Sequence, residues 1–176
     1  MENFAILLRG VNVGGINIKM ADLRECLATL PVQKVKTLLA SGNVVLASEL
    51  PAVELKNRIE EALRKRFDYQ AWVVVLTVKR IAELIEACPY SPDSAEQHSY
   101  VTLSSEPAAV ARLLEEGREL EGQLAALGPE AVAWLAPVGG TLESPISKLT
   151  AKAVYKSTTT TRNLRTLIKI RDAAAS

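Results

Sequence analysis

The sequence predicts an α+β protein built from two ferredoxin-like domains, each a two-layer α-β plait sandwich. Three observations support this prediction. Short apolar runs typical of strands alternate with amphipathic segments typical of helices, and the first half follows the order β-α-β-β-α-β. Each expected helix has one apolar stripe that can lie against a sheet. The chain has 176 residues, of which 48% are hydrophobic, so it can bury a core without a disulfide or a structural metal.

The elements of the first half are bounded by clear turn and helix signals. They are expected, in order, at residues 4–8, 20–30, 35–39, 44–47, 51–67 and 72–76. Apolar residues at helical spacing from Met20 to Leu30 define the first helix, which Pro31 ends. Ser41-Gly42-Asn43 lies between two short apolar runs and predicts a β-hairpin. Pro51 opens the second helix.

The second half begins with a short helix over residues 79–87, which Thr77 can cap. Residues 88–97 include two prolines and two serines, so this loop is the predicted boundary between domains at 1–88 and 89–176. The helix that Pro107 opens ends near Gly117 if that glycine breaks it, or runs to Leu127 if the leucine spacing prevails. Two further strands are expected at 100–103 and 132–135, followed by a turn at 138–140. Two final helices are expected at 147–155 and 162–173.

The composition excludes several classes of protein. Cys26 and Cys88 are far apart and form no CxxC pair, which is typical of reduced cysteines in a cytosolic protein. His98 is the single histidine, so a zinc site with several histidines is excluded, and we expect no metal and no cofactor. The first apolar run stops at Arg9 and lacks a basic flank, so we expect no signal peptide. No stretch approaches the ~20 apolar residues of a membrane span, so the predicted location is the cytoplasm.

The charge is distributed unevenly along the chain. Residues 146–176 have seven basic side chains and one acidic side chain, a net charge of +6, whereas the rest of the chain carries −5. A basic end on an otherwise acidic protein indicates an anionic partner. The alternative is a solvated basic helix face with no partner.

The segment Gly10 to Gly15 has the outer spacing of a phosphate-binding loop, but Ile16 and Asn17 replace the lysine and the hydroxyl residue of that motif. It also lacks the G-x-G-x-x-G pattern of dinucleotide-binding proteins. On local grounds the glycines can simply connect a strand to a helix through positive φ angles. Arg9, however, directly follows an apolar strand, and its guanidinium needs a partner or solvent there.

Two expected helices near the C-terminus begin with a hydroxyl residue followed by a cation. Thr161 is the expected cap before Arg162, and Ser147 is the expected cap before Lys148. A cation at a helix N-terminus is unfavourable unless an anion binds there, so each start predicts a phosphate or carboxylate site. The alternative is that Arg162 and Lys148 pair with acidic residues of the first domain.

Known catalytic and nucleic-acid-binding patterns are absent from the sequence. We find no Ser-His-Asp set around His98, no HExxH and no G-x-S-x-G motif. An RNA-recognition sheet of this topology carries aromatic residues on its central strands. Here Phe4 is the only aromatic residue in those strands, so nucleic acid is a weakly supported partner.

Several of these motifs together resemble a known family, the bacterial domain of unknown function family 1697. The resemblance rests on residues 7–15, 20–23, 41–45, 147–149 and 160–163, with Thr166 and Lys169. It implies two ferredoxin-like plaits and no known activity. This chain departs from the family pattern where Ile16 replaces a lysine, Leu38 a tyrosine, Ala40 a glutamine and Leu164 a tryptophan, so a ligand of its relatives would be contacted differently here.

Together these observations predict a protein that binds a small phosphate- or carboxylate-bearing ligand. The predicted ligand-binding residues are Arg9, Asn12, Gly14, Gly15, Ser41, Gly42, Asn43, Ser147, Lys148, Thr161, Arg162 and Asn163. One alternative is an interaction module whose basic helix face docks an acidic protein or a nucleic acid. Another is an enzyme of unrecognised type, in which Arg162 or Lys148 stabilises developing negative charge. The sequence identifies no catalytic residue and no oligomeric state.

Overall fold

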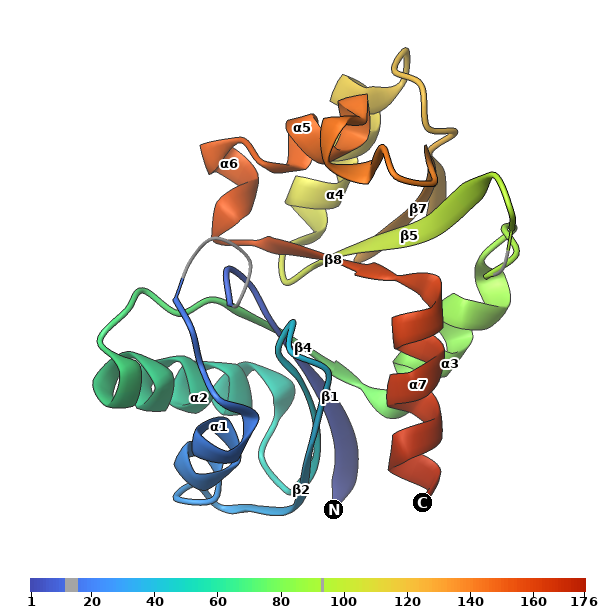
Figure 1. Cartoon of the computed structure of the whole chain (residues 1–176). Helices are drawn as coiled ribbons and strands as arrows, with labels where there is room; N and C mark the ends of the chain where they lie inside the picture. The colour runs from blue at the N-terminus through green and yellow to red at the C-terminus, as the bar shows by residue number, and fades with distance from the viewer. Residues whose placement is uncertain (12–15, 93) are drawn as a thin grey trace. The chain divides into compact units, whose positions relative to one another are not determined.

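The computed structural model describes residues 1–11, 16–92 and 94–176 (Figure 1). The chain divides into two compact units, the first formed by Met1–Ile81 with Lys169–Ser176 and the second by Ala82–Ile168. Each unit contains one four-stranded antiparallel sheet with helices. The predicted α+β class with two ferredoxin-like domains is therefore confirmed.

The first unit has the predicted β-α-β-β-α-β order. Its elements are β1 (Glu2–Leu8), α1 (Met20–Leu27), β2 (Val32–Leu38), β3 (Asn43–Ser48), α2 (Ala52–Phe67) and β4 (Val73–Thr77). The strands lie in the order β2-β3-β1-β4, and every neighbouring pair is antiparallel. This is the split β-α-β arrangement, in which β3 separates β1 from β2.

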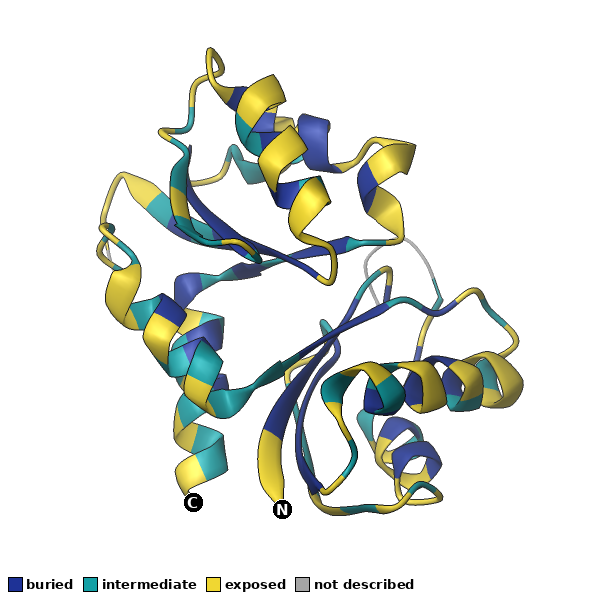
Figure 2. Cartoon of the chain, turned by 180° about the vertical axis from the view of Figure 1, so that it is seen from behind, coloured by how far each residue is buried: buried dark blue, intermediate teal, exposed yellow. Residues whose placement is uncertain are grey.

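The core of the first unit lies between its sheet and the helices α1 and α2. Alternate residues of β1, among them Ile6 and Leu8, point into this core because successive side chains of a strand face opposite sides. They meet the apolar stripe of α2, which includes Leu55 and Ile59. Figure 2 shows the same pattern in both units, with buried residues on the strands and along one side of the longer helices.

The second unit repeats this strand arrangement. Its strands β5 (Gln97–Ser104), β6 (Ala125–Gly128), β7 (Ala131–Pro137) and β8 (Thr159–Asn163) lie in the order β6-β7-β5-β8. Helix α4 (Pro107–Gly117) corresponds to α1 by its place in the order. A short 3-10 turn and two short helices stand where α2 stands in the first unit: Thr141–Glu143, α5 (Pro145–Thr150) and α6 (Ala153–Lys156).

A helix follows the fourth strand of each sheet. These helices are α3 (Val78–Ala87) and α7 (Leu164–Ala175). Thr77 caps α3 as predicted, since its Oγ1 accepts a 3.1 Å hydrogen bond from the Arg80 backbone N–H. The last residues of α7 belong to the first unit, where Lys36 Nζ donates a 3.1 Å hydrogen bond to the Ala173 carbonyl.

The helix that begins at Pro107 takes the shorter of the two predicted lengths and ends at Gly117. A Cβ at Gly117 would lie 2.4 Å from Leu124 Cδ1, so the absence of a side chain lets the following segment pack closely. The leucine spacing beyond Gly117 therefore does not continue a helix. Residues Ala125–Gly128 instead form the edge strand β6.

The two helix starts predicted near the C-terminus are wrong. The cap of α5 is Ser144, whose Oγ accepts a 3.3 Å hydrogen bond from the Ser147 N–H, so Ser147 and Lys148 lie inside the helix. Thr161 and Arg162 belong to β8 rather than to a helix. The physical reason is that β-branched threonines favour an extended strand, and this one pairs with β5.

Among the residues that the structure describes, no helix is both long enough and apolar enough to cross a membrane.

Candidate functional site

The predicted site residues of the first unit that the structure describes, Arg9 and the Ser41-Gly42-Asn43 turn, lie near the end of β1. The Leu8 N–H donates a 2.9 Å hydrogen bond to the Gly42 carbonyl, and the Arg9 N–H donates a 3.1 Å hydrogen bond to the Trp72 carbonyl. The strand end that carries Arg9 is thus fixed between the β2–β3 turn and the residue that precedes β4. The structure therefore brings Arg9 and the Ser41-Gly42-Asn43 turn together, as the sequence led us to expect.

The glycine-rich segment starts from this strand end. Gly10 has a φ of +72°, a left-handed conformation that glycine adopts without strain. Val11 and Ile16 then pair in a parallel β-bridge, which closes the base of the segment. Asn12, Gly14 and Gly15, which the sequence predicts as ligand-binding, lie outside the described residues.

Arg9 is half-buried, and this burial lowers the pKa of its guanidinium. The group keeps its positive charge at neutral pH, because an arginine is not deprotonated in proteins. Partial loss of water around a cation strengthens its attraction to a nearby anion, since the effective dielectric constant is lower than in bulk solvent.

The Ser41-Gly42-Asn43 turn is held by its own side chains. Asn43 is fully buried, and its Nδ2 donates to the Leu38 carbonyl at 3.0 Å and to Ser41 Oγ at 2.9 Å. A Cβ at Gly42 would lie 2.9 Å from Leu8 Cβ, so this glycine permits the close approach of the turn to β1. Asn43 and Gly42 thus position the turn against Arg9's strand.

The predicted site residues of the second unit do not gather at one place. Thr161 Oγ1 lies 2.8 Å from Thr102 Oγ1, which also accepts a 2.9 Å hydrogen bond from Trp134 Nε1. This face of the sheet packs against α5, because Trp134 and Ile146 share one apolar cluster. Arg162, the next residue on β8, must point to the opposite face.

Arg162 is 7% exposed, and its Nη1 donates to Thr160 Oγ1 at 2.6 Å and to the Thr161 carbonyl at 3.0 Å. Lys148 is exposed on α5, which covers the other face of the sheet. The sheet therefore separates these two cations. Asn163 acts as the cap of α7, since its Oδ1 accepts a 2.9 Å hydrogen bond from the Arg165 N–H.

A buried tyrosine, a glutamate and an arginine form a separate polar cluster in the second unit. The Tyr155 hydroxyl donates a 2.9 Å hydrogen bond to Glu116 Oε2, and Arg112 Nε lies 2.9 Å from Glu116 Oε1. Burial, together with the hydrogen bond to Glu116, raises the pKa of Tyr155 to about 12. Hydrogen bonding from Arg112, and then from Tyr155, lowers the pKa of Glu116. A tyrosine so reluctant to ionise is suited to packing rather than to proton transfer at neutral pH.

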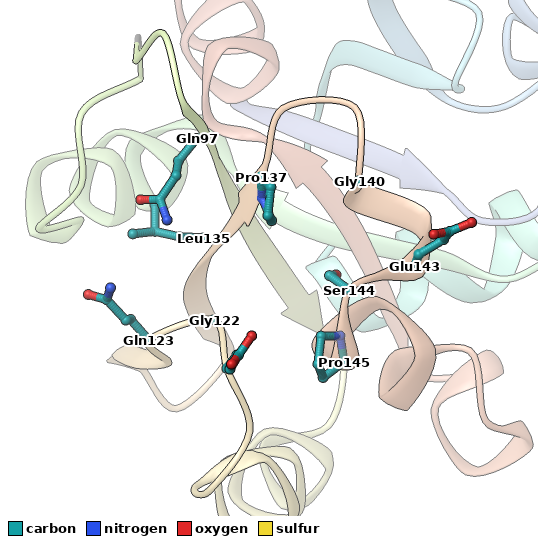
Figure 3. A pocket seen from close by; sticks show the side chains of 10 residues that line it. Gln97, Gly122, Gln123, Leu135, Pro137, Gly140, Glu143, Ser144 and Pro145 are labelled. Atoms are coloured by element: carbon teal, nitrogen blue, oxygen red, sulfur yellow. The ribbon is translucent and has the colours of Figure 1, made fainter.

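A cavity of about 500 Å³ in the second unit was not predicted from the sequence (Figure 3). Residues from three separate segments line it: Gln97, Glu121, Gly122, Gln123, Leu135, Pro137, Gly140, Glu143, Ser144 and Pro145. Sequence patterns could not reveal it, because no single segment carries a motif. Within the described part of the chain, no three histidine, cysteine, aspartate or glutamate side chains lie where they could hold a metal ion.

Comparison with known proteins identifies the family. The profile of a family described as "Protein of unknown function (DUF1697)" matches residues 1–130. The chain belongs to this DUF1697 family. The matched region contains Arg9 and the Ser41-Gly42-Asn43 turn, whereas Lys148 and Arg162 lie beyond it.

Solved structures agree with the fold. The conserved bacterial protein SP0830 from Streptococcus pneumoniae is 24% identical, with a TM-score of 0.79 over 98% of each chain, which shows the fold of this DUF1697 protein to be shared. An unknown protein from Galdieria sulphuraria is 15% identical over 99% of this chain and 89% of its own, and its TM-score of 0.28 is too low to support any argument. No curated protein matches the sequence.

Proposed function

We propose that this DUF1697 protein binds a small phosphate- or carboxylate-bearing ligand in its first unit, beside Arg9. The observation that carries the proposal is a half-buried arginine at the end of β1, where the Leu8–Gly42 backbone hydrogen bond fixes the strand end against the Ser41-Gly42-Asn43 turn. A guanidinium can bind the two oxygens of a carboxylate or phosphate through parallel hydrogen bonds. Such a charge-assisted pair is stronger where water is partly excluded.

The glycine-rich segment provides the second part of the proposed site. Asn12, Gly14 and Gly15 are included on the grounds of sequence alone, because glycines allow backbone N–H groups to approach an anion closely. Ser147, Lys148, Thr161, Arg162 and Asn163 remain proposed ligand-binding residues of the second unit. Their support is now their charge and polarity, since α5 begins at Pro145 and α7 at Leu164 rather than directly after Ser147 and Thr161.

Isothermal titration calorimetry can test the proposal on the full chain, with inorganic phosphate, pyrophosphate, adenosine monophosphate and citrate as probes. We expect one of these anions to bind, and Arg9→Gln to weaken it by about tenfold or more. Arg9→Lys keeps the charge but loses the paired hydrogen bonds, so its affinity for the anion is expected to lie between those of the natural protein and Arg9→Gln.

Arg24→Gln is the matched control, because Arg24 is exposed on α1 of the same unit. It is expected to bind the anion as the natural protein does. A folded Arg9→Gln protein with unchanged affinity, or an equal loss in Arg24→Gln, would contradict the proposed site. Thermal unfolding of each variant shows whether a loss of binding is a loss of fold.

A second candidate function, docking of an acidic macromolecule, is favoured by three lysines in and between α5 and α6. Lys148, Lys152 and Lys156 are four residues apart and all exposed. If they contact duplex DNA phosphates, the logarithm of the binding constant should fall with the logarithm of salt concentration at a slope of about −2.7. Replacing all three by glutamine should remove that dependence.

The proposed location is the cytoplasm, where the free thiols of Cys26 and Cys88 are stable.

A further inference from the structure

The wall of the cavity on the side of the α4–β6 connection is hydrogen-bonded to neighbouring segments of the second unit. The Gly122 carbonyl accepts a 2.7 Å hydrogen bond from the Leu135 N–H, and the Gln123 carbonyl accepts one from the Tyr90 hydroxyl. Gly122 has a φ of +133° and Gln123 a φ of +51°. Backbone strain at a residue other than glycine is retained where the surroundings fix it, and such positions concentrate at ligand sites. These hydrogen bonds tie the α4–β6 connection to β7 and to the segment before β5.

The electrostatic character of the cavity is opposite to that of the Arg9 site. Glu121 and Glu143 line it, and none of its ten described lining residues is basic. Three of the lining backbone N–H groups, those of Leu135, Gly140 and Ser144, already donate within the unit. The prolines at 137 and 145 have no N–H to offer. An anion would thus meet negative charge and few donors, whereas a cation would meet acceptors.

The lining also has an apolar part. Leu135, Pro137 and Pro145 present aliphatic surface, and about 500 Å³ is within the range of small-molecule sites. Figure 3 shows the Gln97 side chain close to Leu135, whereas the Glu143 carboxylate points away from the other labelled side chains. Glu143 is therefore the less favourable of the two carboxylates for a bound group, which leaves Glu121, the other carboxylate of the lining.

We propose that this cavity binds a small organic cation, an alkylamine whose ammonium group pairs with Glu121 and whose carbon chain lies on Leu135. The carboxylate supplies the charge, and the side-chain amide oxygens of Gln97 and Gln123 accept the remaining N–H groups. The aliphatic lining excludes water from the carbon chain. This site is independent of the proposed anion site, because it differs in unit, residues and charge.

The test uses three four-carbon probes whose polar groups are positively charged, neutral and negatively charged: butylamine, 1-butanol and butyrate. Titration of the isotope-labelled full chain is followed by NMR. We expect butylamine to bind most tightly and butyrate not to bind, with shifts in the amide resonances of Gly122, Gln123 and Leu135. Glu121→Gln should weaken butylamine by about fivefold or more, the size expected for loss of one partly solvated ion pair. Glu143→Gln should reduce the affinity for butylamine by less than half of the factor measured for Glu121→Gln.

Glu119→Gln is the matched control, since Glu119 is exposed two residues away and does not line the cavity. It should leave butylamine binding unchanged. The proposal is overturned if butylamine and 1-butanol bind equally, if Glu119→Gln and Glu121→Gln lose equal affinity, or if butylamine shifts no cavity resonance at millimolar concentration. None of these outcomes bears on binding of phosphate or citrate at Arg9, so the two proposals can fail separately.

Discussion

Thr102 and Thr161 share a hydrogen bond of 2.8 Å between their hydroxyl oxygens across strands β5 and β8. The same Thr102 oxygen accepts a 2.9 Å hydrogen bond from the indole N–H of Trp134, which is 1% exposed. Thr102 is therefore the centre of a polar chain inside the second unit. It satisfies the one polar group of a buried tryptophan and joins the edge strand β8 to its neighbour.

We predict that Thr102→Val destabilises the protein by about 1–3 kcal/mol, because it leaves the Trp134 N–H buried without its acceptor. Thr161→Val should cost less, since the bond from Trp134 to Thr102 survives. Urea unfolding followed by tryptophan fluorescence measures both free energies. Equal costs for the two variants would show that the bond from Trp134 does not determine the stability of this chain of hydroxyls.

The two tyrosines with the most strongly raised pKa values should respond oppositely to loss of their hydroxyl. In the described part of the chain the buried Tyr69 hydroxyl has no hydrogen-bond partner, whereas the Tyr155 hydroxyl donates to Glu116. Tyr69→Phe removes a buried hydroxyl that makes no hydrogen bond in the folded state, so it should be neutral or stabilise the protein by up to about 1 kcal/mol. Tyr155→Phe should lower the stability. Denaturant midpoints compare the variants, and destabilisation by Tyr69→Phe would reveal a hydrogen bond to that hydroxyl in solution.

The same tyrosines predict the behaviour at high pH. Burial is the main cause that raises the pKa of Tyr69 and of Tyr155 to about 12, above the value of about 10 for an unfolded chain. The folded state holds these protons more tightly than the unfolded chain. The contribution of the two tyrosines to the free energy of unfolding is therefore complete below about pH 10 and is lost as the pH rises to about 12. Stability should therefore fall over this interval, and Tyr155→Phe should flatten the fall. Absorbance at 295 nm follows the ionisation, and a tyrosinate signal complete by pH 10.5 in the folded protein would refute the prediction.

The fold of the first unit could be predicted from the sequence because its signals are local. Apolar residues at helical spacing mark α2, and Pro51 precedes its first residue. The hairpin around Gly42 needs only its own residues, including the bonds of Asn43. Where each element specifies itself, sequence reasoning gives both its type and its place in the order.

The errors in the second unit arose where distant residues decide the local structure. The threonines before Arg162 suit a helix cap as well as a strand, and only pairing with β5 selects the strand. The end of α4 at Gly117 depends on contact with Leu124, and the four-residue strand β6 has no alternating pattern of its own. Such choices come from tertiary packing, which a local pattern does not encode.

The candidate sites follow the same rule. Arg9 was predicted because one segment contains both the strand and the charge that ends it. The sequence analysis also grouped Lys148 with Arg162, but the two are separated in the structure, because the alternation of β8 turns Arg162 to the face opposite α5. The cavity beside Glu121 was not predicted at all, since it forms only when three segments meet.

The two glycines beside Arg9 make a matched pair that tests how closely the turn must approach β1. Gly10 and Gly42 both have left-handed φ angles, +72° and +83°, and an alanine at either costs about 1–2 kcal/mol on that account. A Cβ at Gly10 meets no described heavy atom within 4 Å, whereas a Cβ at Gly42 lies 2.9 Å from Leu8 Cβ. Gly42→Ala should therefore cost more than Gly10→Ala, and the difference measures the packing of the turn on the strand. Thermal and urea unfolding of both variants give this difference. Equal losses would mean that the turn can move away from Leu8 at no cost, and that the Ser41-Gly42-Asn43 turn is not held in place beside Arg9.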